Sequence, residues 1–186
     1  MVLAVVDRLA LADLVHLYAA TVDDRRFGDV VELFTETAEL RLPDPPQSLE
    51  PVRVHRGRDG VRSAMAALAG VARTEHAIVG EVFAPGSDTD YALGRITCVA
   101  HHFTVDGSNV TDLAWHLRYD DEYLRTRSGW RIHGRALTIN AIETQSVRRL
   151  RPHQAVAPEA GADPSAASIA PQPPRTTPPG RSPGTP

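Results

Sequence analysis

The sequence predicts an α+β fold, a cone-shaped, strongly curved and mainly antiparallel sheet covered by three N-terminal helices. Before residue 70, apolar residues recur mostly every three or four positions, as on helix faces, and afterwards they alternate with polar residues, as on strands. The alternating part divides into four long strands, at 74–84, 90–105, 109–125 and 129–141. Short turn sequences that each contain Gly and Ser separate them. Long strands on consecutive hairpins make a curved antiparallel sheet, and the preceding helices must cover one of its faces.

The helical part begins with one stripe of apolar residues from Leu11 to Val22. Asp7 is a favourable N-cap for this helix, and a run of charged residues starting at Asp23 ends it. A short second helix is predicted from Gly28 to Phe34. These two helices supply apolar side chains that can cover the sheet.

The segment between these helices and the long strands predicts mixed structure. A strand is expected at 38–42 and a brief strand at 53–56. Four prolines, at positions 43, 45, 46 and 51, predict an irregular loop between them. A third helix, rich in alanine, is expected at 59–69, with Gly70 as its stop.

The composition changes near Arg149, which predicts a folded domain over 1–147 and a tail over 148–186. Ten of the 15 prolines follow residue 150, where Val156 and Ile169 are the only residues from the Leu, Ile, Val and Phe set. Such a segment buries too little apolar surface to offset its ordering entropy, so we expect a disordered tail. The simpler interpretation is that the tail is a spacer without chemistry. The alternative is that its Pro-rich sequences dock into an aromatic groove of a partner.

Composition excludes several functional classes. The net charge of -3 gives no overall field that favours nucleic acid or an anionic membrane. All 20 basic residues are arginine, which excludes lysine as a Schiff base, phosphate ligand or general base. The single cysteine, Cys98, excludes an intrachain disulfide and a zinc site of paired cysteines, and its apolar strand face predicts an inert thiol. The N-terminus resembles neither a signal peptide nor a transmembrane span, so we expect a cytoplasmic protein.

Three motifs carry a family resemblance. They are Leu17-Tyr-Ala-Ala-Thr-Val-Asp23 in the first helix, Thr74-Glu-His76 in the first long strand, and Ser128-Gly-Trp-Arg-Ile132, followed by Arg135, in the last. Together they resemble the SnoaL-like branch of the nuclear transport factor two-like superfamily, with its scytalone dehydratases and lindane dehydrochlorinases. The resemblance covers residues 7–141 and implies the cone fold. This cone carries dehydratases, isomerases, cyclases, epoxide hydrolases and proteins without chemistry, so it indicates function poorly.

The resemblance implies a catalytic pair of Asp23 and His76. In such a pair the carboxylate accepts a hydrogen bond from one imidazole nitrogen, which fixes the tautomer and makes the other nitrogen more basic. The simpler interpretation is that Asp23 caps the chain bend and that His76 is hydrogen-bonded for structural reasons. Dyad geometry requires the two side chains to lie within hydrogen-bond reach beside an apolar cavity.

A second histidine is expected in the same cavity. Neighbouring strand residues point to opposite faces, so only one of His101 and His102 can enter it. His102 shares its face with Ile96, Cys98 and Ala100, and it matches the second pocket histidine of the dehydratases, so we expect His102 to act as a general acid or hydrogen-bond donor.

Three aromatic residues are expected to bind substrate, namely Tyr18, Trp115 and Tyr119, although filling of the core explains them as well. Arg118 and Asp120 suggest an epoxide-hydrolase site, but strand alternation places this pair outside the cone. The run from Asp120 to Glu122 is interpreted as exposed.

The resemblance implies a cofactor-independent lyase, isomerase or cyclase acting on a small, apolar, oxygenated substrate of polyketide, terpenoid or steroid-like type in secondary metabolism. We expect no metal, no cofactor, no nucleic-acid or membrane partner, and a homodimer. Val22 stands where scytalone dehydratases have a tyrosine, so the substrate is expected to differ from theirs. The alternatives are a non-catalytic small-molecule-binding domain with the same cavity, an epoxide hydrolase, or a protein-interaction module.

Deleting residues 150–186 is expected to leave the melting temperature nearly unchanged, because few apolar contacts can be lost. Thermal unfolding of the full chain and the shortened chain, followed by circular dichroism, checks this. A fall of more than a few degrees would show that the tail packs on the domain.

Overall fold

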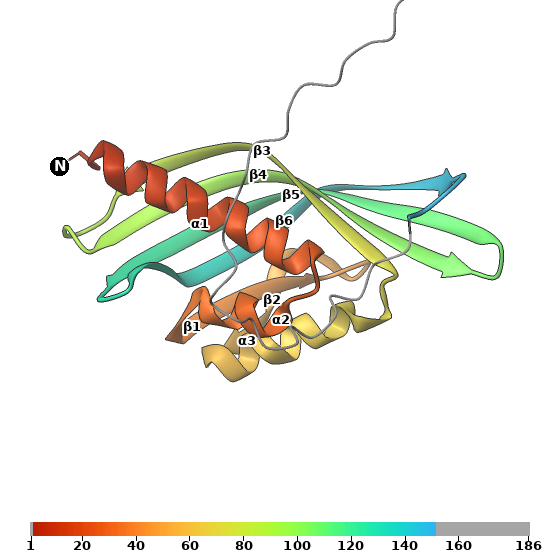
Figure 1. Cartoon of the computed structure of the whole chain (residues 1–186), viewed down its shortest axis with the longest axis horizontal. Coiled ribbons are helices and arrows are strands. Elements are labelled where there is room, and N and C mark those ends of the chain that lie inside the picture. Colours follow the sequence, from red (N-terminus) through yellow and green to blue (C-terminus); the bar gives the residue numbers. More distant parts are fainter. Residues whose placement is uncertain (1, 152–186) are drawn as a thin grey trace, which may run out of the picture. The chain divides into compact units, whose positions relative to one another are not determined.

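The computed structural model describes residues 2–151, which form one curved sheet with helices on one side (Figure 1). The helices are α1 (Val5–Asp23), α2 (Phe27–Glu32), α3 (Gly57–Ala66) and the 3₁₀ helix η1 (Ala67–Gly70). The strands are β1 (Phe34–Asp44), β2 (Ser48–Arg56), β3 (Arg73–Pro85), β4 (Tyr91–Asp106), β5 (Asn109–Thr126) and β6 (Gly129–Val147). The predicted tail lies almost entirely outside the described residues.

The strand order is β2-β1-β6-β5-β4-β3, and β1 with β6 is the one parallel pair among the described strands. The predicted α+β class and the mainly antiparallel sheet are therefore confirmed. In Figure 1, α1 crosses the long strands, while α2 and α3 lie near β1 and β2. This arrangement leaves the space for a cavity between the helices and the inner face of the sheet.

The predicted irregular loop is wrong, because a hairpin occupies that segment. β1 begins already at Phe34, and its hairpin with β2 turns at Pro45-Pro46. Pro51 is tolerated within β2 because β2 is an edge strand and Pro51 lies outside its paired residues. β6 also continues to Val147, six residues beyond the predicted end.

Asp7 does not cap α1, contrary to the sequence prediction. Ala4 holds the N-cap position, and Asp7 lies in the first turn. Its Oδ1 accepts hydrogen bonds from Arg125 Nη2 at 2.7 Å and Trp130 Nε1 at 3.2 Å. The Arg125 guanidinium lies 4.3 Å from the centre of the Trp130 ring. Asp7 therefore ties the start of α1 to the β5–β6 hairpin.

The predicted apolar stripe of α1 is buried in the core, where it meets apolar side chains of the sheet such as Ile96, Leu117 and Ile132. Cys98 belongs to the same core and is fully buried. The predicted burial of this thiol is therefore confirmed, and burial raises its pKa to about 12, which favours an unreactive thiol.

A buried ion pair lies in the middle of this core, and it overturns the prediction of an exposed acidic run. Asp121 Oδ1 accepts from Arg135 Nε at 2.8 Å, and Oδ2 accepts from Arg135 Nη2 at 2.6 Å and from the Tyr123 hydroxyl at 2.6 Å. The guanidinium also lies between two rings, 4.1 Å from that of Tyr18 and 4.2 Å from that of Tyr119. Burial opposes the charge of Arg135, but Asp121 raises the pKa of the guanidinium and keeps it ionised.

Removing the charge of Asp121 should strongly destabilise the fold. Asp121→Asn leaves the Arg135 guanidinium buried without a counter-charge, which costs about 3–5 kcal/mol in such cases. Asp120→Asn is the matched control, because the neighbouring Asp120 is partly exposed and pairs with Arg95 and Arg118 on the outer face. Its expected cost is below about 1 kcal/mol. Urea denaturation of both variants checks this, and equal losses would contradict the prediction.

Candidate active site

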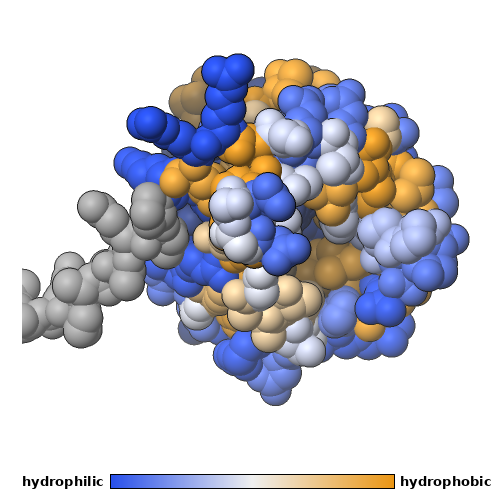
Figure 2. Space-filling model, turned by 90° about the vertical axis from the view of Figure 1, so that its right-hand side faces the viewer, coloured by the Kyte–Doolittle hydropathy of each residue, from blue (hydrophilic) through white to orange (hydrophobic). Residues whose placement is uncertain are grey.

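A cavity of about 560 Å³ lies between the helices and the inner face of the sheet. Most of its lining is apolar or aromatic, including Tyr18, Val22, Met65, Leu113, Leu117 and Tyr119. Figure 2 shows a hollow with hydrophobic walls and hydrophilic side chains around it. Pockets with an apolar lining and a few polar groups are typical small-molecule sites.

Asp23 and His76 meet at this cavity. Asp23 ends α1, and its Oδ1 lies 2.7 Å from Nδ1 of His76 on β3. Its Oδ2 accepts the backbone N–H of the same histidine, also at 2.7 Å. Both side chains are well shielded, with 7% of the His76 side chain and 21% of the Asp23 side chain exposed. The hydrogen bond expected from the sequence is therefore present.

This contact fixes the tautomer of His76. Burial opposes ionisation of Asp23, but the hydrogen bonds from His76 outweigh it and lower the pKa of the carboxyl. An ionised carboxylate only accepts, so Nδ1 of His76 carries a hydrogen, and in the neutral ring Nε2 then has a free lone pair. His76 lines the cavity, and its Nε2 is the atom available to take a proton there.

Arg25 holds the turn that positions Asp23, a role that no motif in the sequence predicts. Its backbone is left-handed, with φ of 59°, which turns the chain sharply after α1. Its guanidinium donates to the carbonyls of Val71, Leu68 and Ala69 at 2.5, 3.0 and 3.1 Å. The end of α1 is thereby fastened to the segment that leads into β3.

His102 faces the same cavity, as predicted, but its hydrogen bonding differs from the expected donor role. Its Nδ1 lies 3.1 Å from the backbone oxygen of Leu113, which can only accept. Burial lowers the pKa of His102, which favours the neutral ring. The neutral ring then carries its hydrogen on Nδ1, so Nε2 is an acceptor and His102 is not an acid in this state.

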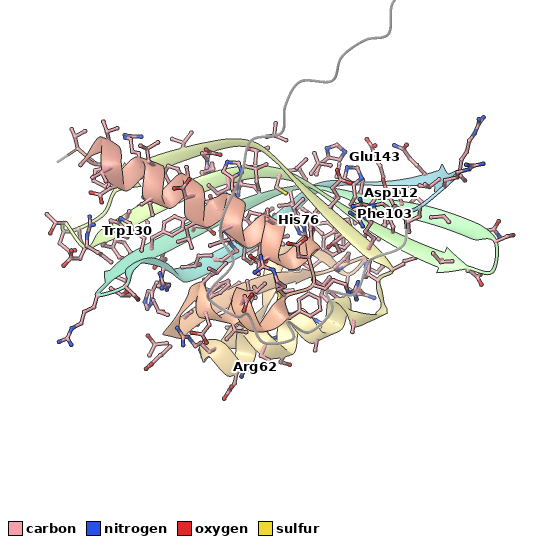
Figure 3. The ribbon with its side chains drawn as sticks, in the orientation of Figure 1. Arg62, His76, Phe103, Asp112, Trp130 and Glu143 are labelled. Carbon is pink, nitrogen blue, oxygen red and sulfur yellow. The ribbon has the colours of Figure 1, made fainter. Side chains whose placement is uncertain are left out.

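His101 lies outside the cavity lining and forms a separate pair with Asp112. Its Nδ1 lies 2.6 Å from Asp112 Oδ2, and its ring stacks on Phe103 with centres 5.9 Å apart. In Figure 3, His76 lies beside the C-terminal half of α1, whereas Phe103 and Asp112 lie toward the far ends of the long strands. The choice of His102 over His101 as the cavity histidine therefore agrees with the structure.

The three aromatic residues predicted to bind substrate, Tyr18, Trp115 and Tyr119, all line the cavity. Tyr18 and Tyr119 also enclose the Arg135 guanidinium, so they fill the core and form a cavity wall at once. The Trp115 ring lies 4.6 Å from that of His102, measured between centres. Both interpretations made from the sequence are therefore compatible with their positions.

Further polar groups of the cavity come from the β1–β2 hairpin, from Ser63 on α3 and from Thr104 on β4. Asp44 and Arg53 form an ion pair of 3.0 Å, and His55 lies on the same strand as Arg53. Arg118 and Asp120, the residues of the epoxide-hydrolase alternative, pair with each other outside the cavity lining.

Within residues 2–151, no group of three or more His, Cys, Asp or Glu side chains is placed to hold a metal ion. No helix in the same range combines the length and apolar character needed to cross a membrane.

Family comparison agrees with this geometry. A model of the SnoaL-like domain matches residues 4–136, which is more than half of the chain. The chain belongs to the SnoaL-like family. The resemblance noted in the sequence is thus confirmed, and the curved, unclosed sheet with its N-terminal helices fits the cone fold of the nuclear transport factor two-like superfamily.

Other proteins are similar to this chain in sequence or in structure. An uncharacterized protein of Mycobacterium tuberculosis is 27% identical over 148 residues, covering 77% of this chain and 88% of that protein. A "Putative Scytalone Dehydratase" from Novosphingobium aromaticivorans has a TM-score of 0.63 and 17% identity, covering 85% and 96% of the two chains. The protein LinA has a TM-score of 0.64 and 18% identity, covering 78% and 94%. At these identities the two structures show a common fold only.

Lowering the pH should reduce the free energy of unfolding of this SnoaL-like domain through protonation of His102 in the unfolded chain. Burial holds the folded-state pKa of His102 below its ordinary value of about 6.5, so below that pH the unfolded chain binds a proton that the folded chain does not. The free energy of unfolding must then fall with falling pH. Urea denaturation between about pH 7.5 and 5.5 should show a shallower pH dependence for His102→Phe than for the wild type. An unchanged slope would contradict the assignment.

Proposed function

We propose that this protein is a lyase, isomerase or cyclase that moves a proton on a small, largely apolar, oxygenated molecule with its own side chains. The observation that carries the proposal is the Asp23–His76 pair at an apolar cavity, with Oδ1 and Nδ1 2.7 Å apart. An isolated hydrogen bond of this kind also occurs for structural reasons. Here the free Nε2 faces a space large enough for a ligand.

His76 is the proposed base. Its Nε2 takes a proton from a carbon beside a carbonyl, or from a hydroxyl, and the ring becomes an imidazolium. Asp23 stabilises that charge and holds the ring in place, since its second oxygen is fixed by the His76 backbone N–H. The electron pair released from the substrate forms a double bond or attacks a second carbon. The imidazolium then returns the proton to a leaving oxygen or to another carbon of the substrate.

His102 is the proposed second polar contact. Because its neutral ring presents Nε2 as an acceptor, it orients a substrate hydroxyl rather than protonating a leaving group. The centres of the two histidine rings are 6.4 Å apart, so one small substrate can touch both. The aromatic walls from Tyr18, Trp115 and Tyr119 would hold its apolar body.

The family supports this class of reaction. The proteins of the same fold include one described as a dehydrochlorinase of hexachlorocyclohexane and one described as a putative scytalone dehydratase. Both descriptions name eliminations, in which a proton is removed from the substrate. A polyketide, terpenoid or steroid-like substrate in secondary metabolism is the proposed finer assignment, since such molecules are apolar, oxygenated and of suitable size for the cavity.

Exchange of carbon-bound hydrogen tests the proposal. Bicyclic and tricyclic ketones and hydroxyketones are incubated with the protein in D₂O, and loss of the α-hydrogen signals is followed by NMR. Asp23→Asn should slow exchange by about 10²- to 10⁴-fold, because an amide cannot stabilise the imidazolium. His76→Ala should be as damaging as the double variant, since the pair acts as one unit.

His101→Ala is the control, because His101 neighbours His102 in sequence but lies outside the cavity lining. It should exchange substrate hydrogen at nearly the wild-type rate. If no compound exchanges faster with protein than without it, although compounds bind in the cavity, the non-catalytic binding domain becomes the better description.

A further inference from the structure

Two of the three histidines that line the cavity, His76 and His102, share one property: each donates its Nδ1 hydrogen to another part of the protein. His76 Nδ1 donates to the Asp23 carboxylate, and His102 Nδ1 donates to the Leu113 carbonyl. Neither acceptor can supply a hydrogen in return. Each neutral ring therefore turns a bare Nε2 lone pair toward any ligand between them.

Within residues 2–151, the ring hydrogen bonds of His76 and His102 are made through Nδ1 and none is made through Nε2. The lining residues on α1, β4 and β5 include the apolar Val22, Ala100, Leu113 and Leu117, and also the hydroxyl-bearing Tyr18, Thr104 and Tyr119. The indole nitrogen of Trp115 is sealed from solvent and has no hydrogen-bond partner within residues 2–151. A ligand that brings two hydrogens of its own pairs both acceptors, whereas a ligand without them leaves both unpaired at a cost in affinity.

We propose that this end of the cavity recognises a vicinal dihydroxy group, one hydroxyl donating to Nε2 of His76 and the other to Nε2 of His102, on a flat ring system. The ring centres lie 6.4 Å apart and nearly perpendicular, at 72°, so hydrogen bonds of about 2.8 Å from each ring can converge on neighbouring oxygens. The flat aromatic walls and the volume of about 560 Å³ suit two or three fused rings. A vicinal diol on fused rings is thus the substrate class of the proposed reaction. Its conversion depends on the proposed function, whereas its binding does not.

Other functional groups on a ligand fit the two Nε2 acceptors less well than a vicinal diol. A carbonyl or an ether oxygen would set its lone pairs against those of both Nε2 atoms. A carboxylate would need both rings protonated, and burial of His102 together with the adjacent His76 ring disfavours a second positive charge. A single hydroxyl leaves one of the two acceptors without a partner.

Isothermal titration calorimetry near pH 7.5 with four probes tests the inference. The probes are 2,3-dihydroxynaphthalene, 2-naphthol, naphthalene and 2,3-dimethoxynaphthalene, which differ in how many hydrogens they donate. At about fivefold to tenfold in affinity per hydrogen bond, the diol should bind about 25- to 100-fold more tightly than naphthalene or the diether, with naphthol between them. Equal affinity of the diol and naphthol would overturn the inference.

Two matched variants locate the effect. His102→Phe keeps a flat ring but removes the acceptor, so the diol should lose about fivefold to tenfold in affinity while naphthalene is unaffected. His101→Phe changes the adjacent residue outside the cavity lining and should leave both affinities at the wild-type level. An equal loss in both variants, or no loss in His102→Phe, would refute the assignment. Should His102→Phe unfold, the ¹⁵N signal of His102 Nε2 in the wild type must move on adding the diol and stay fixed on adding the diether.

These measurements need no turnover, so they separate the two proposals. Tight diol binding without proton exchange would leave this inference standing and remove the enzymatic one. Exchange on substrates that carry no diol, with equal binding of all four probes, would do the reverse.

Discussion

The buried ion pair between Asp121 and Arg135 is the constraint on which the rest of this domain depends. Two charges removed from water are tolerated only when their geometry is nearly complete, and here the carboxylate has three donors. The pair joins β5 to β6, and the ring of Tyr18 brings α1 onto the same guanidinium. Tyr18 and Tyr119 also line the cavity. The Asp121–Arg135 ion pair, which their rings contact, therefore sets the position of these two cavity walls.

The cavity follows from how the helices are fastened over the curved sheet. Asp7 fixes the start of α1 to the β5–β6 hairpin, and Arg25 fixes its end to the segment before β3. The helix is thus held at both ends by polar contacts, while its apolar stripe fills the core between them. The last residue of the helix, Asp23, can then reach across to His76 without a gap.

Strand alternation was the most productive signal in the sequence. It predicted the long strands, the inert Cys98 and the inward position of His102, because side-chain direction in a strand depends only on parity. The same parity places Asp121 inside, but three consecutive acidic residues suggested a solvated run, and their buried partner Arg135 lies on the next strand. The sequence also does not reveal which ring nitrogen of His102 carries the hydrogen, because the carbonyl of Leu113 on a neighbouring strand determines this. The pairing of Asp23 with His76 came from family resemblance, since 53 residues separate them along the chain.

The way Asp23 is anchored separates the placement of the carboxylate from the identity of its partner. One oxygen binds the ring of His76, but the other binds the backbone N–H of that same position, which every residue except proline provides. A change of side chain at position 76 therefore leaves an oriented negative charge beside an empty space of imidazole shape. This space can bind free imidazole from solution, or it can be filled by a different side chain in a related protein. The fold can thus exchange its base while keeping the group that activates it.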